Sequence, residues 1–315
     1  MSRSFDLLVI GDVNPDVVVG PVSRAMAFGQ REQLVERGGL VLGGSAAIMA
    51  CGAARLGLRV AFAGRVGADP AGAFVRGALT DRGVDVTHLT TDPQLPTPLT
   101  VVLNDKDGDR AILTSPGCLT ATSARDVPEA LLSDARHVHA ASFFLMPRLA
   151  RSLAAVFARA RSHGASTSLD TNDDPDGRWD REPLDAVLEF TDILLPNAAE
   201  ARALTGESQL GSAAAALAGV VPLVVVKDGS EGALAHDGER VRRVPAVPVE
   251  PIDTVGAGDS FDAGFVTATL RGLDLYSSLT LAAACGSLST RGHGGTAAQP
   301  TWHEAYAHTD LESRT

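Results

Sequence analysis

Short apolar runs alternate along this chain with stretches of helical periodicity, and this alternation constrains the fold more than any other feature. A helix after Asp69-Pro70 begins with a cap and a first-turn proline and ends at Gly83, and residues 147–164 repeat the pattern. Such alternation predicts an α/β protein whose mostly parallel sheet is covered by helices on both faces. The runs predicted as buried strands are 7–10, 60–63, 137–142, 167–169, 193–195 and 223–226.

Two segments, residues 16–42 and 97–114, interrupt the alternation with β-rich sequence. Within the second, a polar turn at 104–109 separates the apolar runs 99–103 and 111–113, which is a hairpin signal. We interpret the two segments as a small β lid inserted into a single α/β domain that spans residues 1–315.

The stretch from Asp253 to Asp262 carries the clearest chemical signal. Gly256, Ala257 and Gly258 precede Asp259, and an amphipathic helix is predicted to follow. Glycines at a helix start let an anion approach unpaired N–H groups, and the helix dipole favours negative charge there. A carboxylate beside such a cradle suits a general base that activates a hydroxyl for attack on phosphorus. The alternative is an ordinary glycine-rich loop in which Asp259 only interacts with the dipole.

Polar residues follow four of the predicted strands, at 11–16, 170–172, 196–200 and 227–232. Ligands of open α/β sheets bind beyond the carboxyl ends of the strands, so these loops predict one shared site. Asn197 and Glu200 also have the spacing of a structural capping box, and Gly229, Ser230 and Gly232 also suit a plain turn. Neither Lys106 nor Lys227, the two lysines of the chain, lies in a Walker sequence, which excludes a P-loop NTPase.

Residues 253–259, Asp-Thr-Val-Gly-Ala-Gly-Asp, resemble letter for letter the Asp-Thr-x-Gly-Ala-Gly-Asp signature of the ribokinase-like (PfkB) carbohydrate kinases. The resemblance implies a three-layer α/β/α fold with a β lid, ATP as phosphoryl donor, Asp259 as the base and residues 256–258 as the anion hole. It also implies nucleotide-binding roles for the residues that match the family's motifs in the later loops: Asn197, Lys227, Gly229, Ser230, Gly232, Gly256 and Gly258.

The N-terminal loop and the paired glycines of residues 43–44 resemble the family's substrate-binding motifs. The structural alternatives are a solvated turn for the N-terminal loop and a plain loop-to-helix junction for the paired glycines. Ile48 stands where the family usually has asparagine, which puts the substrate in doubt and raises the alternative of a nucleoside kinase. A non-catalytic sugar-binding relative would be expected to lose Asp259. The substrate-binding residues implied by the resemblance are Asn14, Asp16, Gly43, Gly44, Ile48 and Asp259.

The resemblance further implies Mg²⁺ that rides on the nucleotide, with Glu200 in its environment through water. It implies K⁺ as a candidate activator beside Asp253 and residues 290–292, and a homodimer formed through the lid. These remain expectations about cofactors and partners.

Composition narrows the remaining function classes. A net charge of −11 argues against nucleic acid or an anionic membrane as a partner. The three cysteines lack metal-site spacing, and no signal-peptide or membrane-span pattern is present, so we expect a cytoplasmic protein. His137 and His139 alternate on one strand without a third ligand, which favours packed histidines over a zinc site.

Overall fold

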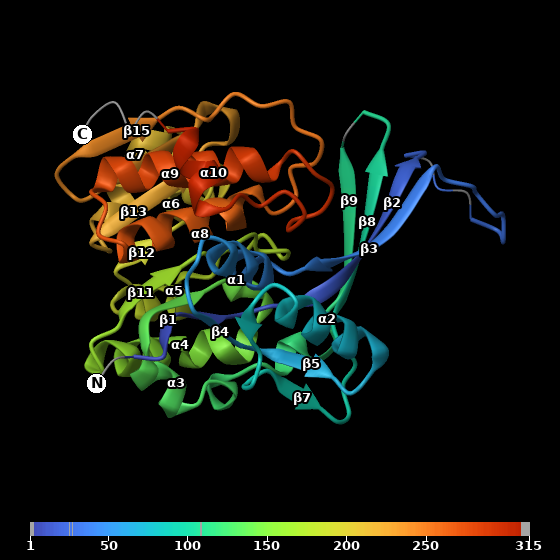
Figure 1. Cartoon of the computed structure of the whole chain (residues 1–315), viewed down its shortest axis with the longest axis horizontal. Coiled ribbons are helices and arrows are strands. Elements are labelled where there is room, and N and C mark those ends of the chain that lie inside the picture. The colour runs from blue at the N-terminus through green and yellow to red at the C-terminus, as the bar shows by residue number, and fades with distance from the viewer. Residues whose placement is uncertain (1–2, 25, 27, 108, 310–315) are drawn as a thin grey trace.

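A nine-stranded sheet forms the centre of the molecule in the computed structural model, which describes residues 3–24, 26, 28–107 and 109–309 (Figure 1). Its strand order is β15-β14-β13-β12-β11-β10-β1-β4-β6. The strands from β13 to β6 pair in parallel, and β14 and β15 add antiparallel at one edge. Their bounds are β1 Phe5–Ile10, β4 Val60–Ala63, β6 Val84–Asp85, β10 Ala135–Ala140, β11 Ser166–Leu169, β12 Ile193–Leu194, β13 Leu223–Lys227, β14 Ala233–His236 and β15 Val241–Val244.

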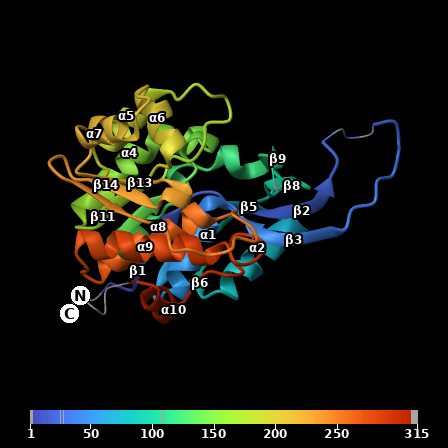
Figure 2. The same ribbon diagram turned by 90° about the horizontal axis from the view of Figure 1, so that it is seen from above.

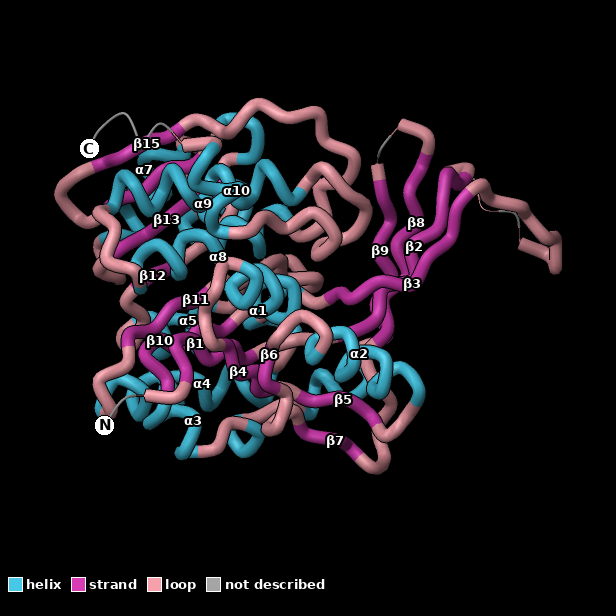
Figure 3. Tube along the Cα trace, in the orientation of Figure 1, coloured by secondary structure: helices cyan, strands magenta, loops and turns pink. Residues whose placement is uncertain are grey.

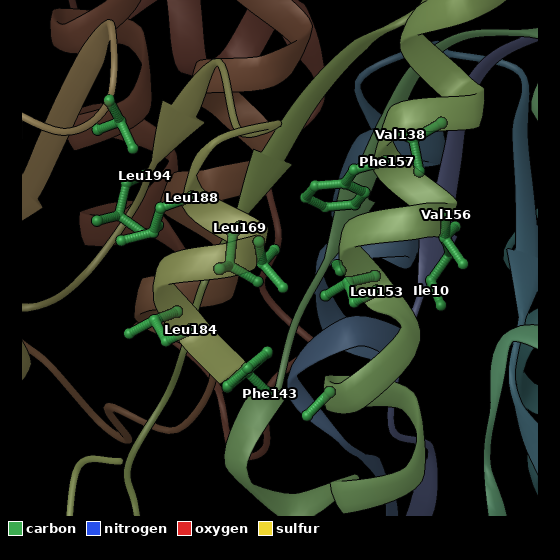
Figure 4. Packing of buried hydrophobic residues seen from close by; sticks show 14 of the residues in the cluster. Ile10, Val138, Phe143, Leu153, Val156, Phe157, Leu169, Leu184, Leu188 and Leu194 are labelled. Atoms are coloured by element: carbon green, nitrogen blue, oxygen red, sulfur yellow. The ribbon is translucent and has the colours of Figure 1, made fainter. Parts of the chain in front are cut away.

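Helices cover both faces of this sheet because successive strand residues point to opposite sides. Leu8 and Ile10 of β1 pack with α3 to α7 in one apolar core, part of which Figure 4 shows. Leu7 and Val9 belong to the core on the other face, with α1 and α8. The helices are α1 Ser45–Arg55, α2 Pro70–Thr80, α3 Glu129–Asp134, α4 Pro147–Ser162, α5 Arg181–Leu188, α6 Ala198–Thr205, α7 Leu210–Ala218, α8 Ala257–Leu270, α9 Leu275–Ser289 and α10 Trp302–Ala307.

A separate four-stranded sheet projects from the body as the lid (Figures 2 and 3). Its order is β3-β2-β8-β9, built from β2 Asn14–Val22, β3 Arg37–Gly43, β8 Leu99–Asp105 and β9 Arg110–Ser115. The predicted hairpin is β8 and β9, and both β-rich segments join in one sheet. A two-stranded sheet, β5 Arg65–Gly67 and β7 Thr90–Asp92, lies near the base of the lid and was not predicted.

The three-layer α/β/α fold, the mostly parallel sheet and the β lid are confirmed. Asp69 caps α2 by accepting the N–H of Gly72, as its sequence position predicted. The amphipathic character predicted for the helix after Asp259 is wrong. Residues 259–268 of α8 are all buried, because α8 lies between the sheet, α1 and α9. Among the described residues, no helix has both the length and the apolarity that crossing a membrane requires.

Two helix glycines are predicted to respond in opposite ways to substitution by alanine. Gly264 lies in α8 at its close contact with α9, and Gly77 lies in α2. A Cβ at Gly264 would lie 2.8 Å from Cys285 Sγ and 3.0 Å from Ala282 Cα. We expect Gly264→Ala to lower the free energy of unfolding by about 1–3 kcal/mol through overpacking. Gly77, on the exposed side of α2, has no neighbour within 4 Å of such a Cβ. Gly77→Ala should therefore stabilise by about 0.5–1 kcal/mol. Denaturant unfolding measures both, and a Gly264→Ala variant as stable as the native protein would contradict this packing.

Candidate active site

The start of α8 is a helix end that lacks a side-chain cap. Gly256 occupies the N-cap position in the left-handed region, with φ of 72°. Among the described residues no side chain caps this helix, although Ala257 N–H donates to Thr254 O at 3.3 Å. A Cβ on Gly256 would approach Gly295 Cα to 2.6 Å and Ile48 Cγ2 to 2.9 Å. Glycine is thus required both for the turn and for the close approach. The open N–H groups suit an anion.

A cavity of about 720 Å³ lies against this helix start. It brings together most of the residues predicted for the nucleotide, and Ala257, Gly258 and Asp259 form part of its wall. An apolar stretch from Ala246 to Val249 and residues of α9 line it as well. The predicted residues that line it are Asn197, Glu200, Lys227, Gly229, Ser230, Gly232, Ala257, Gly258 and Asp259, whereas Gly256 is not in its wall.

Lys227, at the end of β13, is held between two buried carboxylates. Its Nζ lies 2.6 Å from Asp170 Oδ2 and 3.0 Å from Asp262 Oδ2. Burial opposes the charge on Lys227, but the two carboxylates outweigh it and raise the pKa of the ammonium. Burial also opposes ionisation of Asp170, yet Lys227 lowers the pKa of that carboxyl. The cavity therefore contains one fixed positive charge beside the anion cradle.

Asp259 is 8% exposed and faces several other acids. Burial first, and then the charge of Asp170, raise its pKa well above the usual range, while the charge of Lys227 opposes this shift. Carboxylate oxygens of Asp170, Asp259 and Asp262 lie within 4.8 Å of one another. An acid with a raised pKa in a cavity beside an anion site has the character of a proton acceptor.

Asn197 and Glu200 form the capping box that their spacing predicted. Asn197 Oδ1 accepts the N–H of Glu200, and Glu200 Oε2 accepts the N–H of Asn197 at 2.8 Å. Burial, followed by the charge of Asp170, raises the pKa of Glu200 to about 7. Asn197 and Glu200 therefore cap α6 and also line the cavity, so the structural and the functional interpretation are compatible.

The residues predicted for the substrate gather where the lid joins the body. Asn14 Nδ2 donates to Asp16 Oδ1 at 2.5 Å and to Thr100 Oγ1 at 3.1 Å. A Cβ on Gly43 would lie 2.1 Å from Asp16 Oδ1, so only glycine leaves room for that carboxylate. Gly44, with φ of 92°, turns the chain into α1.

Asp12, which was not singled out from the sequence, accepts the N–H groups of Ser45 and Ala46 at the start of α1. Its negative charge adds to burial in raising the pKa of Asp16 to about 7.

Neither Ile48 nor Asp253 is among the described residues that line the cavity, and both contact the glycines at 294–295. Ile48 is 3% exposed and packs against Gly256 and Gly295. Asp253 Oδ1 accepts the N–H of Val255, and its Oδ2 accepts the N–H of Gly294.

Arg110, from lid strand β9, reaches the same place. It lies 3.7 Å from Asp253 Oδ1 and donates to Thr254 Oγ1 at 2.8 Å.

Sequence reasoning missed Asp262, Arg110 and residues 246–249. Asp262 lies one turn after Asp259, so helical spacing could have indicated that their carboxylates lie close together. An apolar, proline-containing segment before the signature could have indicated an apolar part of the cavity wall. Nothing local indicates Arg110, since it contacts Thr254 across 144 positions.

His137 and His139 are buried and hydrogen-bonded to Ser166 and Ser168, so their interpretation as packed strand histidines is confirmed.

The raised pKa of Asp16 makes a prediction about stability. An acid with a raised folded-state pKa stabilises fully below its unfolded pKa of 3.8, and this contribution is lost as pH rises through about 7. Asp16→Asn cannot ionise and retains an acceptor for Asn14. We expect the variant to gain thermal stability over the native protein at about pH 8.5 and to gain much less at about pH 5. An equal difference in Tm at both pH values would contradict this assignment.

Three comparisons place the chain among known proteins. The pfkB family carbohydrate kinase model matches residues 4–302. The fructokinase of Klebsiella pneumoniae is 33% identical over 272 residues, which cover 82% of this chain and 88% of that protein. The structure of Arabidopsis thaliana ribokinase complexed with ribose and ATP has a TM-score of 0.83 at 26% identity, covering 98% of this chain and 99% of that one. An Escherichia coli protein assigned as ribokinase II, solved with ATP and Mg²⁺, has a TM-score of 0.85 at 25% identity and covers all of both chains. This chain belongs to the PfkB family of carbohydrate kinases.

Proposed function

We propose that the protein transfers the γ-phosphoryl group of ATP to a hydroxymethyl group of a sugar or sugar-like substrate. The observation that carries this proposal is the start of α8, where uncapped N–H groups and the Asp259 carboxylate meet at one wall of the cavity. The relatives named above support it, because they include a fructokinase and a ribokinase solved with ribose and ATP.

In this proposal Asp259 removes the proton from the acceptor hydroxyl. The hydroxyl oxygen then forms a bond to the γ-phosphorus, and the bond from phosphorus to the β–γ bridging oxygen breaks, so ADP leaves with that electron pair. The N–H groups of residues 256–258 stabilise negative charge on the transferring group. Lys227 lies within reach of the same oxygens, since a Cβ at Gly258 would be 3.7 Å from its Nζ. Asn197, Gly229, Ser230 and Gly232 line the nucleotide end.

Mg²⁺ bound with the nucleotide would supply positive charge that offsets the charge of the phosphates, and Glu200 is the residue that would face it. Both carboxylate oxygens of Glu200 already accept hydrogen bonds from Asn197. This arrangement fits a contact to the ion through water and does not fit direct coordination, which would break the capping box. The charges of Asp170 and Asp262 are already offset by Lys227, which forms an ion pair with each of them.

ATP consumption against a panel of sugars, polyols and nucleosides tests the proposed function. Turnover of a sugar supports it, and turnover of nucleosides alone would favour the alternative of a nucleoside kinase. No turnover of any acceptor would indicate a non-catalytic relative.

Ile48 packs against Gly256 of the anion loop, so its influence on the choice of substrate is proposed to act through the position of Gly256. An Ile48→Asn variant in the same panel checks this influence.

The role of Asp259 predicts a selective loss of rate. Asp259→Asn is nearly isosteric and removes the base, so we expect kcat to fall by about 10²–10⁴-fold while sugar affinity largely survives. Asp274→Asn is a matched control, because it makes the same change at a helix start outside the cavity and keeps an oxygen that can accept the N–H of Ser277. Kinetics with separate titrations of ATP and sugar measure both. Turnover of Asp259→Asn within about threefold of the native rate would mean that the base lies elsewhere.

We also propose that K⁺ activates the enzyme by binding beside the Asp253 carboxylate. Arg110 Nη1 lies 3.7 Å from Asp253 Oδ1, so the guanidinium competes with a cation for this oxygen. We expect any stimulation by K⁺, relative to tetramethylammonium, to be larger in Arg110→Gln than in the native enzyme. Equal rates in both salts for both proteins would remove K⁺ from the account.

We also propose a homodimer formed through the lid. Leu40, Val17, Val101 and Leu113 are successive cross-strand partners, so they share one face of the lid sheet. Leu40 and Leu113 are 52% and 60% exposed. The opposite face carries Asp16, Thr100 and Thr114, which belong to the substrate side. An exposed apolar face on a projecting sheet suits a second copy of the same surface.

The dimer proposal predicts that a charge on this apolar face separates the protomers. Leu113→Glu should shift the mass measured by sedimentation from dimer to monomer. Val220→Glu, at an exposed apolar residue of the body, is the control and should leave the mass unchanged. A native protein that sediments as a monomer would contradict the proposal.

A further inference from the structure

We propose that Thr114, on lid strand β9, is a specificity-determining residue that donates a hydrogen bond to an oxygen of the sugar. Asn14 and Thr100 set the direction of this bond. The inference rests on the proposed function and deepens it, because it favours an acceptor with oxygens on both sides of its ring over one that presents an apolar group to this part of the lid.

Three side chains form one polar row across the lid sheet. Asp16 of β2 is the cross-strand partner of Thr100 of β8, and Thr100 is the partner of Thr114 of β9. Directly opposed residues of neighbouring strands share a face, so all three lie on one side of the lid. Two strand spacings, about 10 Å, separate the Asp16 end of the row from the Thr114 end. The Asp16 end adjoins Gly43, where a Cβ would collide with its carboxylate.

This side of the lid faces the body of the protein. Arg110 lies four residues before Thr114 on β9, and alternate residues of a strand point to the same side. Arg110 donates to Thr254 Oγ1 at 2.8 Å, and Thr254 lines the cavity at the start of α8. Thr114 is exposed, so its hydroxyl is open to a molecule held between the lid and the body.

The orientation of the Asn14 amide sets the direction of the hydrogen bonds in this row. Asn14 Nδ2 donates to Asp16 Oδ1 at 2.5 Å and lies 3.4 Å from the carbonyl oxygen of Pro15. Because a carbonyl oxygen can only accept, the NH₂ group of Asn14 must be the end that faces these oxygens. The same NH₂ group donates to Thr100 Oγ1 at 3.1 Å.

Thr100 passes this direction on to Thr114. Thr100 is 8% exposed, and a buried hydroxyl proton needs an acceptor. Its oxygen already accepts from Asn14, and within the described part of the chain its remaining hydrogen-bond partner is Thr114 Oγ1 at 3.1 Å. Thr114 therefore accepts from Thr100 and keeps its own proton for a further acceptor.

The polar row gives the substrate one acceptor and one donor. The neighbouring row on the same face is apolar, because it consists of the cross-strand partners Val18, Val102 and Ile112. Asp16 can accept from one hydroxyl of a sugar, and Thr114 can donate to an oxygen further along the ring. An apolar group placed against the row would leave both polar side chains unpaired, which costs binding free energy.

Loss of the Thr114 hydroxyl should weaken the use of the sugar. Thr114→Val keeps the shape of the side chain and removes the donor. For the sugar that the native enzyme uses best, we expect kcat/KM to fall about five- to tenfold while the KM for ATP stays within about twofold. Thr114→Ser keeps a hydroxyl and should retain most of the native value. Ser115→Ala removes an exposed hydroxyl from the opposite face of the lid and is the control that should have no effect.

Singly deoxygenated analogues of that sugar show whether Thr114 touches the substrate. The native enzyme should discriminate against the analogue that lacks the oxygen bonded by Thr114, and Thr114→Val should lose this discrimination for that analogue alone. A side chain that only packs within the lid would affect all analogues alike. Thr100→Val should reduce discrimination against the same analogue and should add little in the Thr114→Val background.

Native kcat/KM in Thr114→Val would overturn this inference. Equal discrimination among the analogues by the native enzyme and by Thr114→Val would also overturn it. The proposed function fails by a different result, since no turnover of any sugar by the native enzyme defeats it and the inference together. An active sugar kinase with an unchanged Thr114→Val variant defeats only the role of Thr114.

Discussion

The ion pairs of Lys227 with Asp170 and Asp262 are the interaction on which the site depends. Several carboxylates converge at the start of α8, and burying them without a partner would cost several kcal/mol each. Lys227 is a single cation between two of them. Among the described residues, Asp259 is then the acid of this cluster that has no cation in direct contact. The arrangement separates two roles, since two acids hold the lysine and a third, Asp259, remains available as a base.

The burial of residues 259–268 of α8 favours this electrostatic arrangement. An anion cradle at a helix start is most effective where water is excluded, because electrostatic interactions strengthen in a low dielectric. α8 lies between the sheet and α9, and Gly264 permits the close contact with α9. Because residues 259–268 are buried, α8 has no exposed polar face, although the sequence was interpreted as an amphipathic helix. The error thus came from treating α8 as a surface helix.

The elements with strong local signals could be predicted from the sequence. The apolar strand runs, the cap at Asp69 and the hairpin turn of the lid all depend on neighbouring residues. The site could be predicted in part, through motifs that lie at strand ends. The contact of Asn172 with Ser45 spans 127 positions, and that of Arg110 with Thr254 spans 144. No local pattern encodes such contacts, and only the fold brings those side chains together.

The central claim is that the phosphoryl group passes directly from ATP to the substrate, with Asp259 acting as a base. The stereochemical course at phosphorus tests it most directly. With ATP made chiral at the γ-phosphorus by isotopic oxygen and sulfur, a single in-line displacement inverts the configuration in the product. The account predicts inversion. Retention would contradict it, because two displacements would mean that the enzyme first carries the phosphoryl group itself, with a carboxylate such as Asp259 as the nucleophile.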